Sequence, residues 1–130
     1  MIGDSIALGV GQTLPECRTE AQVGITSQRF AQEVRSPPAA DKVVISLGAN
    51  DGASPAIAAN LERVRSSVRA STVYWLLPPH GEYARAAIRD VALRFGDWLI
   101  DYEPAAGPDG LHPTGAGYRS LGALIRSAGT

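Results

Sequence analysis

Apolar residues along this chain form two kinds of pattern, continuous β-branched runs and runs with helical spacing. Two continuous runs are clear, KVVISL at residues 42–47 and TVYWLL at residues 72–77. Weaker apolar stretches cover residues 1–2, 19–23 and 97–101. Uninterrupted apolar runs of this length are typical of strands that are buried on both faces. We therefore predict five strands.

The segments between and after these strands show apolar residues three or four positions apart, as helices that face a core require. Three such stripes are Ile57, Leu61, Val64 and Val68; Ile88, Val91 and Phe95; and Tyr118, Leu121, Leu124 and Ile125 on a closing helix at 115–127. Ser54, which precedes Pro55, is predicted to be the N-cap of the first of these helices. Gly96 is predicted to end the second. In all, five helices alternate with the five strands.

This alternation predicts an α/β fold, a three-layer α/β/α sandwich with a five-stranded parallel sheet, because parallel neighbours need right-handed crossover helices. For 130 residues we expect one domain over residues 1–130 and the flavodoxin-like strand order 2-1-3-4-5. In such sheets ligands bind beyond the carboxyl ends of the strands, near the point where the strand order reverses. Site residues are therefore expected directly after strands.

Charge and hydropathy exclude several classes of partner. Twelve basic and thirteen acidic residues are dispersed along the chain, so the sequence predicts no basic patch that would bind nucleic acid. No run of 18 apolar residues is present for a membrane span, and no leader pattern opens the chain as written. We expect a cytoplasmic protein, unless a missing N-terminal segment directs secretion or joins it to a longer protein. The sequence does not set an oligomeric state.

The sequence also predicts the burial of a few single side chains and the place of one loop. Cys17 is the one cysteine, so it has no partner for an internal disulfide, and we expect it to be buried as a small apolar residue. Trp75 and Trp98 are predicted to belong to the core. The segment RSPPAAD at residues 35–41 is predicted to be a surface loop.

Polar residues follow four of the predicted strands. Gly3, Asp4 and Ser5 come after the first strand and Gly24 after the second. Asn50 in GAND follows the third, and PDGLHPT, with Asp109 and His112, follows the fifth. Because parallel strands end at one edge of the sheet, these residues are expected to meet there.

These residue types supply each part that ester hydrolysis by a serine nucleophile needs. Ser5 would attack, His112 would take its proton, and Asp109 would orient the imidazole. The backbone N–H groups of Ser5 and Gly24 and the side-chain amide of Asn50 would receive the oxyanion.

Together these four blocks resemble those of the SGNH (GDSL-type) hydrolase family. Gly3–Ser5 matches its first block, Gly24 the second, residues 48–51 the third, and residues 109–114 the Asp-x-x-His block. The resemblance covers residues 3 to about 120. It implies esterase, lipase, thioesterase or carbohydrate deacetylase activity without a metal or an organic cofactor. Only Met1 and Ile2 precede Gly3, so the first strand is shorter than is usual in the family.

Each candidate also has a structural interpretation. Ser5 could be a helix N-cap, Asn50 an Asx turn, and Asp109 an ordinary turn residue beside Gly110. Gly24 could serve backbone geometry alone.

Three further residues lie close to these blocks in the sequence. Asp4 is expected to tighten the turn or to cap the first helix. Asp51 is expected to orient neighbouring loops, with substrate contact as a second role. His80 follows the fourth strand and could touch substrate or be an exposed loop histidine.

The function that we predict is a serine esterase for short-chain or O-acetyl esters of a carbohydrate. Short loops after the third and fourth strands leave no length for a deep acyl tunnel or a lid. Two alternatives stay open, a lysophospholipase- or thioesterase-type acyl hydrolase and a catalytically weak glycan-binding module. A dinucleotide fingerprint is not formed, since the third glycine of G-x-G-x-x-G is absent after Gly9 and Gly11.

Overall fold

A computed structural model describes residues 1–34 and 37–128. Over these residues it contains one five-stranded parallel sheet with the order β2-β1-β3-β4-β5. The strands are β1 (Ile2–Gly3), β2 (Glu20–Ala21), β3 (Ala40–Ser46), β4 (Ala70–Leu77) and β5 (Trp98–Asp101). The predicted strand order 2-1-3-4-5 is confirmed.

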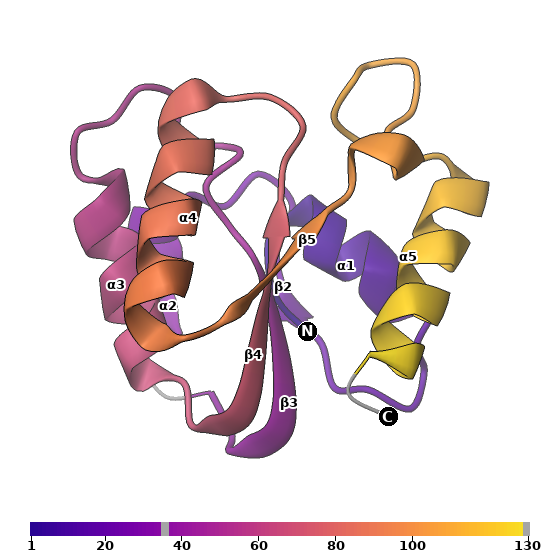
Figure 1. The fold of residues 1–130 in the computed structure, drawn as a ribbon, viewed down its shortest axis with the longest axis horizontal. Helices are drawn as coiled ribbons and strands as arrows, with labels where there is room; N and C mark the ends of the chain where they lie inside the picture. The colour runs from indigo at the N-terminus through magenta and orange to yellow at the C-terminus, as the bar shows by residue number, and fades with distance from the viewer. Residues whose placement is uncertain (35–36, 129–130) are drawn as a thin grey trace.

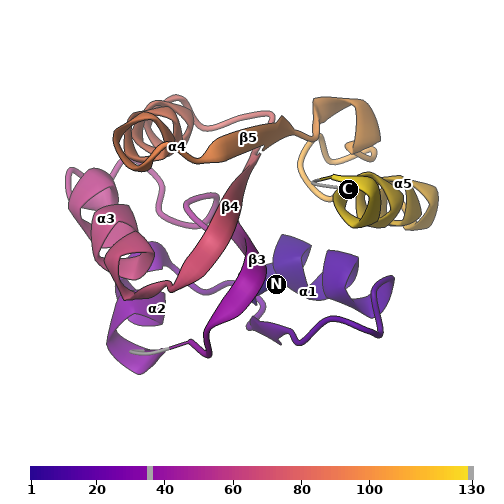
Figure 2. The ribbon, with the colours of Figure 1, turned by 60° about the horizontal axis from the view of Figure 1, so that its bottom comes forward.

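The helices cover both faces of this sheet. They are α1 (Ser5–Gln12), α2 (Ser27–Glu33), α3 (Ile57–Ser67), α4 (Glu82–Phe95) and α5 (Gly115–Ser127), with a short 3-10 helix, η1 (Glu103–Ala105). Figures 1 and 2 show α2, α3 and α4 on one face and α1 and α5 on the other, so the predicted three-layer sandwich is confirmed. Among the described residues, none of these helices has the length and the apolar character to cross a membrane.

Each face of the sheet has its own hydrophobic core. The core under α2, α3 and α4 contains Phe30, Leu61 and Trp75, all almost fully buried. The core under α1 and α5 contains Ile6 and Tyr102. Both faces of β3 and β4 are therefore covered, which explains their uninterrupted apolar runs.

Strand lengths differ from the predicted ones because pairing partners set them. β3 and β4 both start two residues earlier than their apolar runs, since Ala40 pairs with Ala70 in the register. The predicted strand at 19–23 shrinks to two residues. β2 pairs with β1 alone, and β1 offers only Ile2 and Gly3 as partners.

Five predictions about single side chains are wrong. Trp98 is 64% exposed, because it lies on β5 at the edge of the sheet. Leu124 on α5 is half exposed, and Phe95, the last residue of α4, is 37% exposed. Cys17 is exposed, in a turn after α1 where its backbone N–H bonds Leu14. Ser54 is not the N-cap of α3, which begins at Ile57 after a turn in which the Ser54 hydroxyl accepts from the Ala56 N–H.

Other expectations agree with the structure in whole or in part. Trp75 is fully buried, and Gly96 ends α4 in the left-handed conformation, with φ of +69°. Of the predicted loop at 35–41, residues 35 and 36 lie outside the described part of the chain. Ala40 and Asp41 already belong to β3.

Candidate active site

A sharp strand-to-helix turn positions Ser5 at the carboxyl edge of the sheet. β1 ends at Gly3, and Ser5 is the first residue of α1. Gly3 has φ of +135°, and a Cβ atom there would lie 1.9 Å from the carbonyl oxygen of Ser46. Only glycine permits this close approach of β1 to β3. The contact is fixed by the Asp4 N–H, which donates to the same Ser46 carbonyl at 2.9 Å.

The cap of α1 is Asp4 and not Ser5. The Asp4 Oδ1 atom accepts a hydrogen bond from the Ile6 N–H at 3.0 Å, which is the usual N-cap contact. The interpretation of Ser5 as a plain N-cap is therefore wrong, and the expected capping role of Asp4 is confirmed. The Ser5 hydroxyl is left for another contact.

His112 reaches this serine from a loop that is closed on itself. The Gly107 N–H donates to the His112 carbonyl at 2.8 Å, and the Gly110 N–H donates to Gly107. Thr114 then caps α5. Figure 1 shows this loop, in orange, standing beyond the end of the sheet between η1 and α5.

Ser5, His112 and Asp109 form one chain of hydrogen bonds. The Ser5 Oγ and His112 Nε2 atoms are 3.1 Å apart, although 107 residues separate them in the sequence. The His112 Nδ1 atom lies 2.8 Å from Asp109 Oδ2. An imidazole held between a hydroxyl and a carboxylate is the arrangement that activates a serine.

The Asp109 carboxylate is stabilised in its ionised form. Its Oδ1 atom accepts hydrogen bonds from the backbone N–H groups of Leu111 and His112, at 2.9 and 2.8 Å. The Leu111 N–H, the His112 side chain and the His112 N–H, in that order of size, lower the pKa of Asp109 below its ordinary value. The side chains of His112 and Asp109 are nevertheless 47% and 54% exposed, so this chain of hydrogen bonds faces solvent.

Hydrogen bonds connect the loops after β2 and β3, the two strands that flank the strand leading to Ser5. The Asn50 Nδ2 atom donates to the Ile25 carbonyl at 3.1 Å. Asp51 accepts from the backbone N–H of Ser27 at 2.9 Å and from its hydroxyl. Because β1 lies between β2 and β3, Gly24 and Asn50 follow the two strands on either side of the one that leads to Ser5.

Asp51 thus has the loop-orienting contact that its sequence position predicts. Gly24 has φ of +75°, and a Cβ atom added there would meet nothing within 4 Å. Gly24 and Asn50 are both exposed. The oxyanion contacts of Gly24 and Asn50 and the substrate contact of Asp51 stay predictions.

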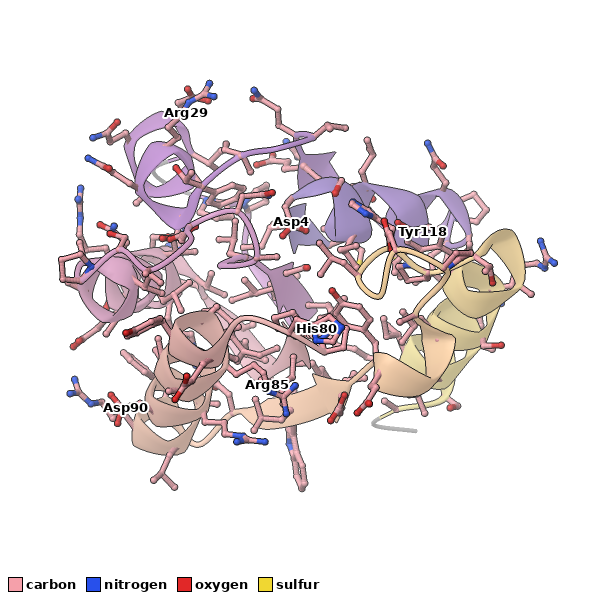
Figure 3. All side chains as sticks on the ribbon, turned by 90° about the horizontal axis from the view of Figure 1, so that it is seen from above. Asp4, Arg29, His80, Arg85, Asp90 and Tyr118 are labelled. Atoms are coloured by element: carbon pink, nitrogen blue, oxygen red, sulfur yellow. The ribbon has the colours of Figure 1, made fainter. Side chains whose placement is uncertain are left out.

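His80 lies against the loop that carries Asp109 and His112. It is exposed, and a Cβ atom on Gly110 would come within 2.9 Å of its Nε2 atom. Figure 3 looks onto the carboxyl ends of the strands and shows Asp4, His80 and Tyr118 around the middle of this end, with Arg29 and Asp90 at the rim. The position of His80 beside the candidate site is therefore clear, and substrate contact remains a prediction.

The sequence did not lead us to predict the contacts that pack α1 against α5. A Cβ atom on Gly9 would come within 2.4 Å of the Tyr118 ring, so the glycine allows α1 to approach α5. The glycines of ALGVGQTL inside a helix were the signal for close contacts, since Gly9 faces α5 and Gly11 faces Thr19, just before β2. Across the described residues, no three side chains of histidine, cysteine, aspartate or glutamate are grouped as a metal site.

The sheet order and the covering helices define a flavodoxin-like α/β/α fold, with Ser5 directly after the central strand β1. No protein-family model matches the chain, and no curated protein matches its sequence. Similarity is found among solved structures. The protein YxiM from Bacillus subtilis is 18% identical with a TM-score of 0.67 over 96% of this chain, which spans about half of that protein, 54%.

Two more structures match along almost their whole length. A candidate lipolytic protein of the G-D-S-L family from Desulfitobacterium hafniense is 18% identical, with a TM-score of 0.58 over 96% of this chain and 95% of its own. A candidate lipase from Chitinophaga pinensis is 12% identical, with a TM-score of 0.58 over 95% and 94%. At these identities the similarity establishes the fold, and at that level it confirms the resemblance seen in the four blocks.

Proposed function

We propose that this protein is a serine hydrolase that cleaves carboxylic esters through an acyl-enzyme on Ser5. The observation that carries the proposal is the chain of hydrogen bonds from Ser5 Oγ through His112 to Asp109. The similarity in fold to candidate lipolytic proteins of the G-D-S-L family supports the same reaction class.

In the first half of the reaction, Ser5 Oγ would form a bond to the ester carbonyl carbon while its proton passes to His112 Nε2. The negative charge of Asp109 would stabilise the imidazolium that results. The lowered pKa of Asp109 keeps this carboxylate ionised throughout the neutral range. Collapse of the tetrahedral intermediate would release the alcohol, which takes its proton from His112.

In the second half, His112 would remove a proton from a water molecule as the water oxygen bonds to the acyl carbon. The bond from that carbon to Ser5 Oγ would then break, His112 would return the proton to Ser5 Oγ, and the carboxylic acid would leave. Both tetrahedral intermediates carry an oxyanion that the N–H groups of Ser5 and Gly24 and the amide of Asn50 would stabilise. An amide has two N–H groups, so the Asn50 bond to the Ile25 carbonyl fixes the side chain and leaves the second N–H for a ligand.

For the substrate, we propose a short acyl group, with an O-acetyl group on a carbohydrate as the leading case. The open space around Gly24 and the half-exposed side chains of His112 and Asp109 support an acyl group that needs no enclosing tunnel. Burial of each methylene of a long acyl chain would contribute about 0.8 kcal/mol, a gain that an open surface cannot provide. A lysophospholipase- or thioesterase-type substrate is therefore the second candidate.

A fluorophosphonate probe tests the reaction class. We expect the probe to label wild-type protein at Ser5, because the probe reacts with serines that a neighbouring base activates. A folded sample that is not labelled, and that binds a glycan saturably, would instead support the glycan-binding module. A panel of p-nitrophenyl esters from acetyl to dodecanoyl then tests the acyl preference, and a kcat/KM that rises with chain length would favour the second candidate.

Asn50→Ala tests the oxyanion contact. Removing one donor to an oxyanion typically lowers kcat by about 10²–10³-fold, and we expect a loss of that size with KM little changed. Asn50→Asp is the matched variant, since it keeps the shape, removes the donor and places a charge that repels the oxyanion. An Asn50→Ala protein with wild-type kcat would assign this side chain to loop structure alone.

A further inference from the structure

Asp4 is buried beside the candidate nucleophile and connects α1 to β3. The residue is only 1% exposed. The Oδ1 atom accepts hydrogen bonds from the Ile6 N–H at 3.0 Å and from the Ser46 hydroxyl at 2.9 Å. The first turn of α1, and with it Ser5, is therefore held in place through one oxygen of this carboxyl group.

The other carboxyl oxygen has no partner. Among the described residues, Asp4 Oδ2 and the Tyr102 hydroxyl are the two buried side-chain atoms for which no hydrogen bond is found. An ionised carboxylate needs donors at both oxygens when it is buried, and a missing donor is costly. A neutral carboxyl group avoids most of that cost, since the proton sits on Oδ2 while Oδ1 keeps its two donors.

Burial of Asp4 also favours its neutral form. Burial raises the pKa of the Asp4 carboxyl to about 6, against hydrogen bonds from Ser46 and the backbone that lower it. The charges of Asp4 and of Asp109 on the loop both act on the hydroxyl groups of Tyr102 and Tyr118. The pKa values of both tyrosines are raised, first by burial and next by the charge of Asp4, so that neither supplies a negative charge.

We propose that Asp4 is a positioning residue for Ser5 whose neutral form makes the serine more reactive than its ionised form does, because a charge there would oppose the oxyanion formed beside the first turn of α1. This inference rests on the proposed function. The N-terminus of a helix favours a developing negative charge, and an anion within the same turn offsets that effect. Protonated Asp4 keeps the two hydrogen bonds that hold the turn and removes the anion.

Asp4→Asn is the variant that separates the two roles of the carboxyl group. The asparagine oxygen can accept the bonds from Ile6 and Ser46, and its amide is neutral at every pH. Asp4→Ala removes the bonds as well. We expect Asp4→Ala to label more slowly with the fluorophosphonate than wild type at every pH, by about tenfold or more, and Asp4→Asn to restore most of that loss.

The decisive measurement is the rate of Ser5 labelling from pH 5 to pH 8, expressed as the ratio of Asp4→Asn to wild type. We expect the ratio to rise about tenfold, with a midpoint near pH 6, as wild-type Asp4 ionises. Asp90→Asn is the control, since Asp90 is exposed on α4, and its ratio to wild type should be flat.

Thermal unfolding gives a readout that does not depend on activity. Because the pKa of Asp4 is higher in the folded protein than the ordinary value of about 3.9, its contribution to stability is complete below about pH 4 and is lost as the pH rises through 6. The Tm of Asp4→Asn minus that of wild type should therefore increase by several degrees between pH 4 and pH 7. A difference in Tm that stays constant with pH overturns the proposal.

The remaining outcomes are distinct. If wild type is labelled and the ratio is flat or falls with pH, Asp4 is not a neutral positioning residue, and the proposed function stands. If folded wild type is not labelled, the proposed function fails and this inference fails with it. Should Asp4→Asn not fold, Ser46→Ala replaces it. Loss of the Ser46 hydrogen bond should move the NMR titration of the Asp4 carboxyl to higher pH, and an unmoved midpoint overturns the proposal.

Discussion

Ser5→Ala is expected to lower kcat for p-nitrophenyl acetate by at least about 10⁴-fold. The side chain supplies the only atom proposed to bond to the acyl group, and loss of the serine from a Ser-His-Asp unit removes nearly all of its rate enhancement. Residual turnover would come from the oxyanion donors and from binding alone. Steady-state kinetics between pH 6 and pH 8 measure the loss.

The fold should not depend on this hydroxyl, since the cap of α1 is Asp4 and the Ser5 Oγ contact is to the exposed loop histidine. Circular dichroism and Tm should therefore match the wild-type values. Ser66→Ala is the matched control, an exposed serine on α3 on the far face of the sheet, and should retain full activity. Turnover that survives Ser5→Ala would remove the serine from the mechanism.

Gly3→Ala is expected to destabilise the protein by about 3–5 kcal/mol, among the largest single effects that a small residue can have. Two costs combine at this position. The φ of +135° is unfavourable for any side chain, and the new Cβ atom would lie 1.9 Å from a backbone oxygen of β3. That oxygen cannot move without breaking the pairing of β1 with β3. Urea unfolding measures the change in free energy.

Gly96→Ala separates these two costs. Gly96 also has a positive φ, of +69°, but a Cβ atom there would meet nothing within 4 Å. We expect it to cost about 1 kcal/mol, from backbone strain alone. Equal losses in the two variants would show that the approach of β1 to β3 is not what requires glycine at position 3.

The fold was predictable because its central strands are buried on both faces. The runs at 42–47 and 72–77 can only be accommodated between two layers of helices, and the alternation with helical stripes then fixes parallel pairing. Strand ends were less predictable. β2 has two residues because β1 has two, which no pattern within residues 19–23 reveals.

The predictions of which single side chains are buried failed for a similar reason. Trp98 is as apolar as Trp75, but one lies on the edge strand β5 and the other on β4 between two layers. Hydrophobicity alone does not distinguish an edge strand from a central one. Cys17 is exposed because it falls in a turn, and its identity as a cysteine carries no information about that turn.

The candidate site was predictable to the extent that its groups follow strands directly. Ser5 and the loops containing Gly24, Asn50 and His112 all lie at the predicted edge of the sheet. The surroundings of Asp4 were not predictable. Its partner Ser46 is 42 residues away on β3, and its burial depends on packing between elements that have no common sequence pattern.

The exposure of His112 and Asp109 bears on how an acyl-enzyme would be consumed. With about half of each side chain open to solvent, bulk water reaches the imidazole from the surface without an enclosed path. An added alcohol would then compete with the solvent itself for the same base. The partition of acyl groups should therefore favour the free acid, and ester exchange should grow only in proportion to the concentration of added alcohol.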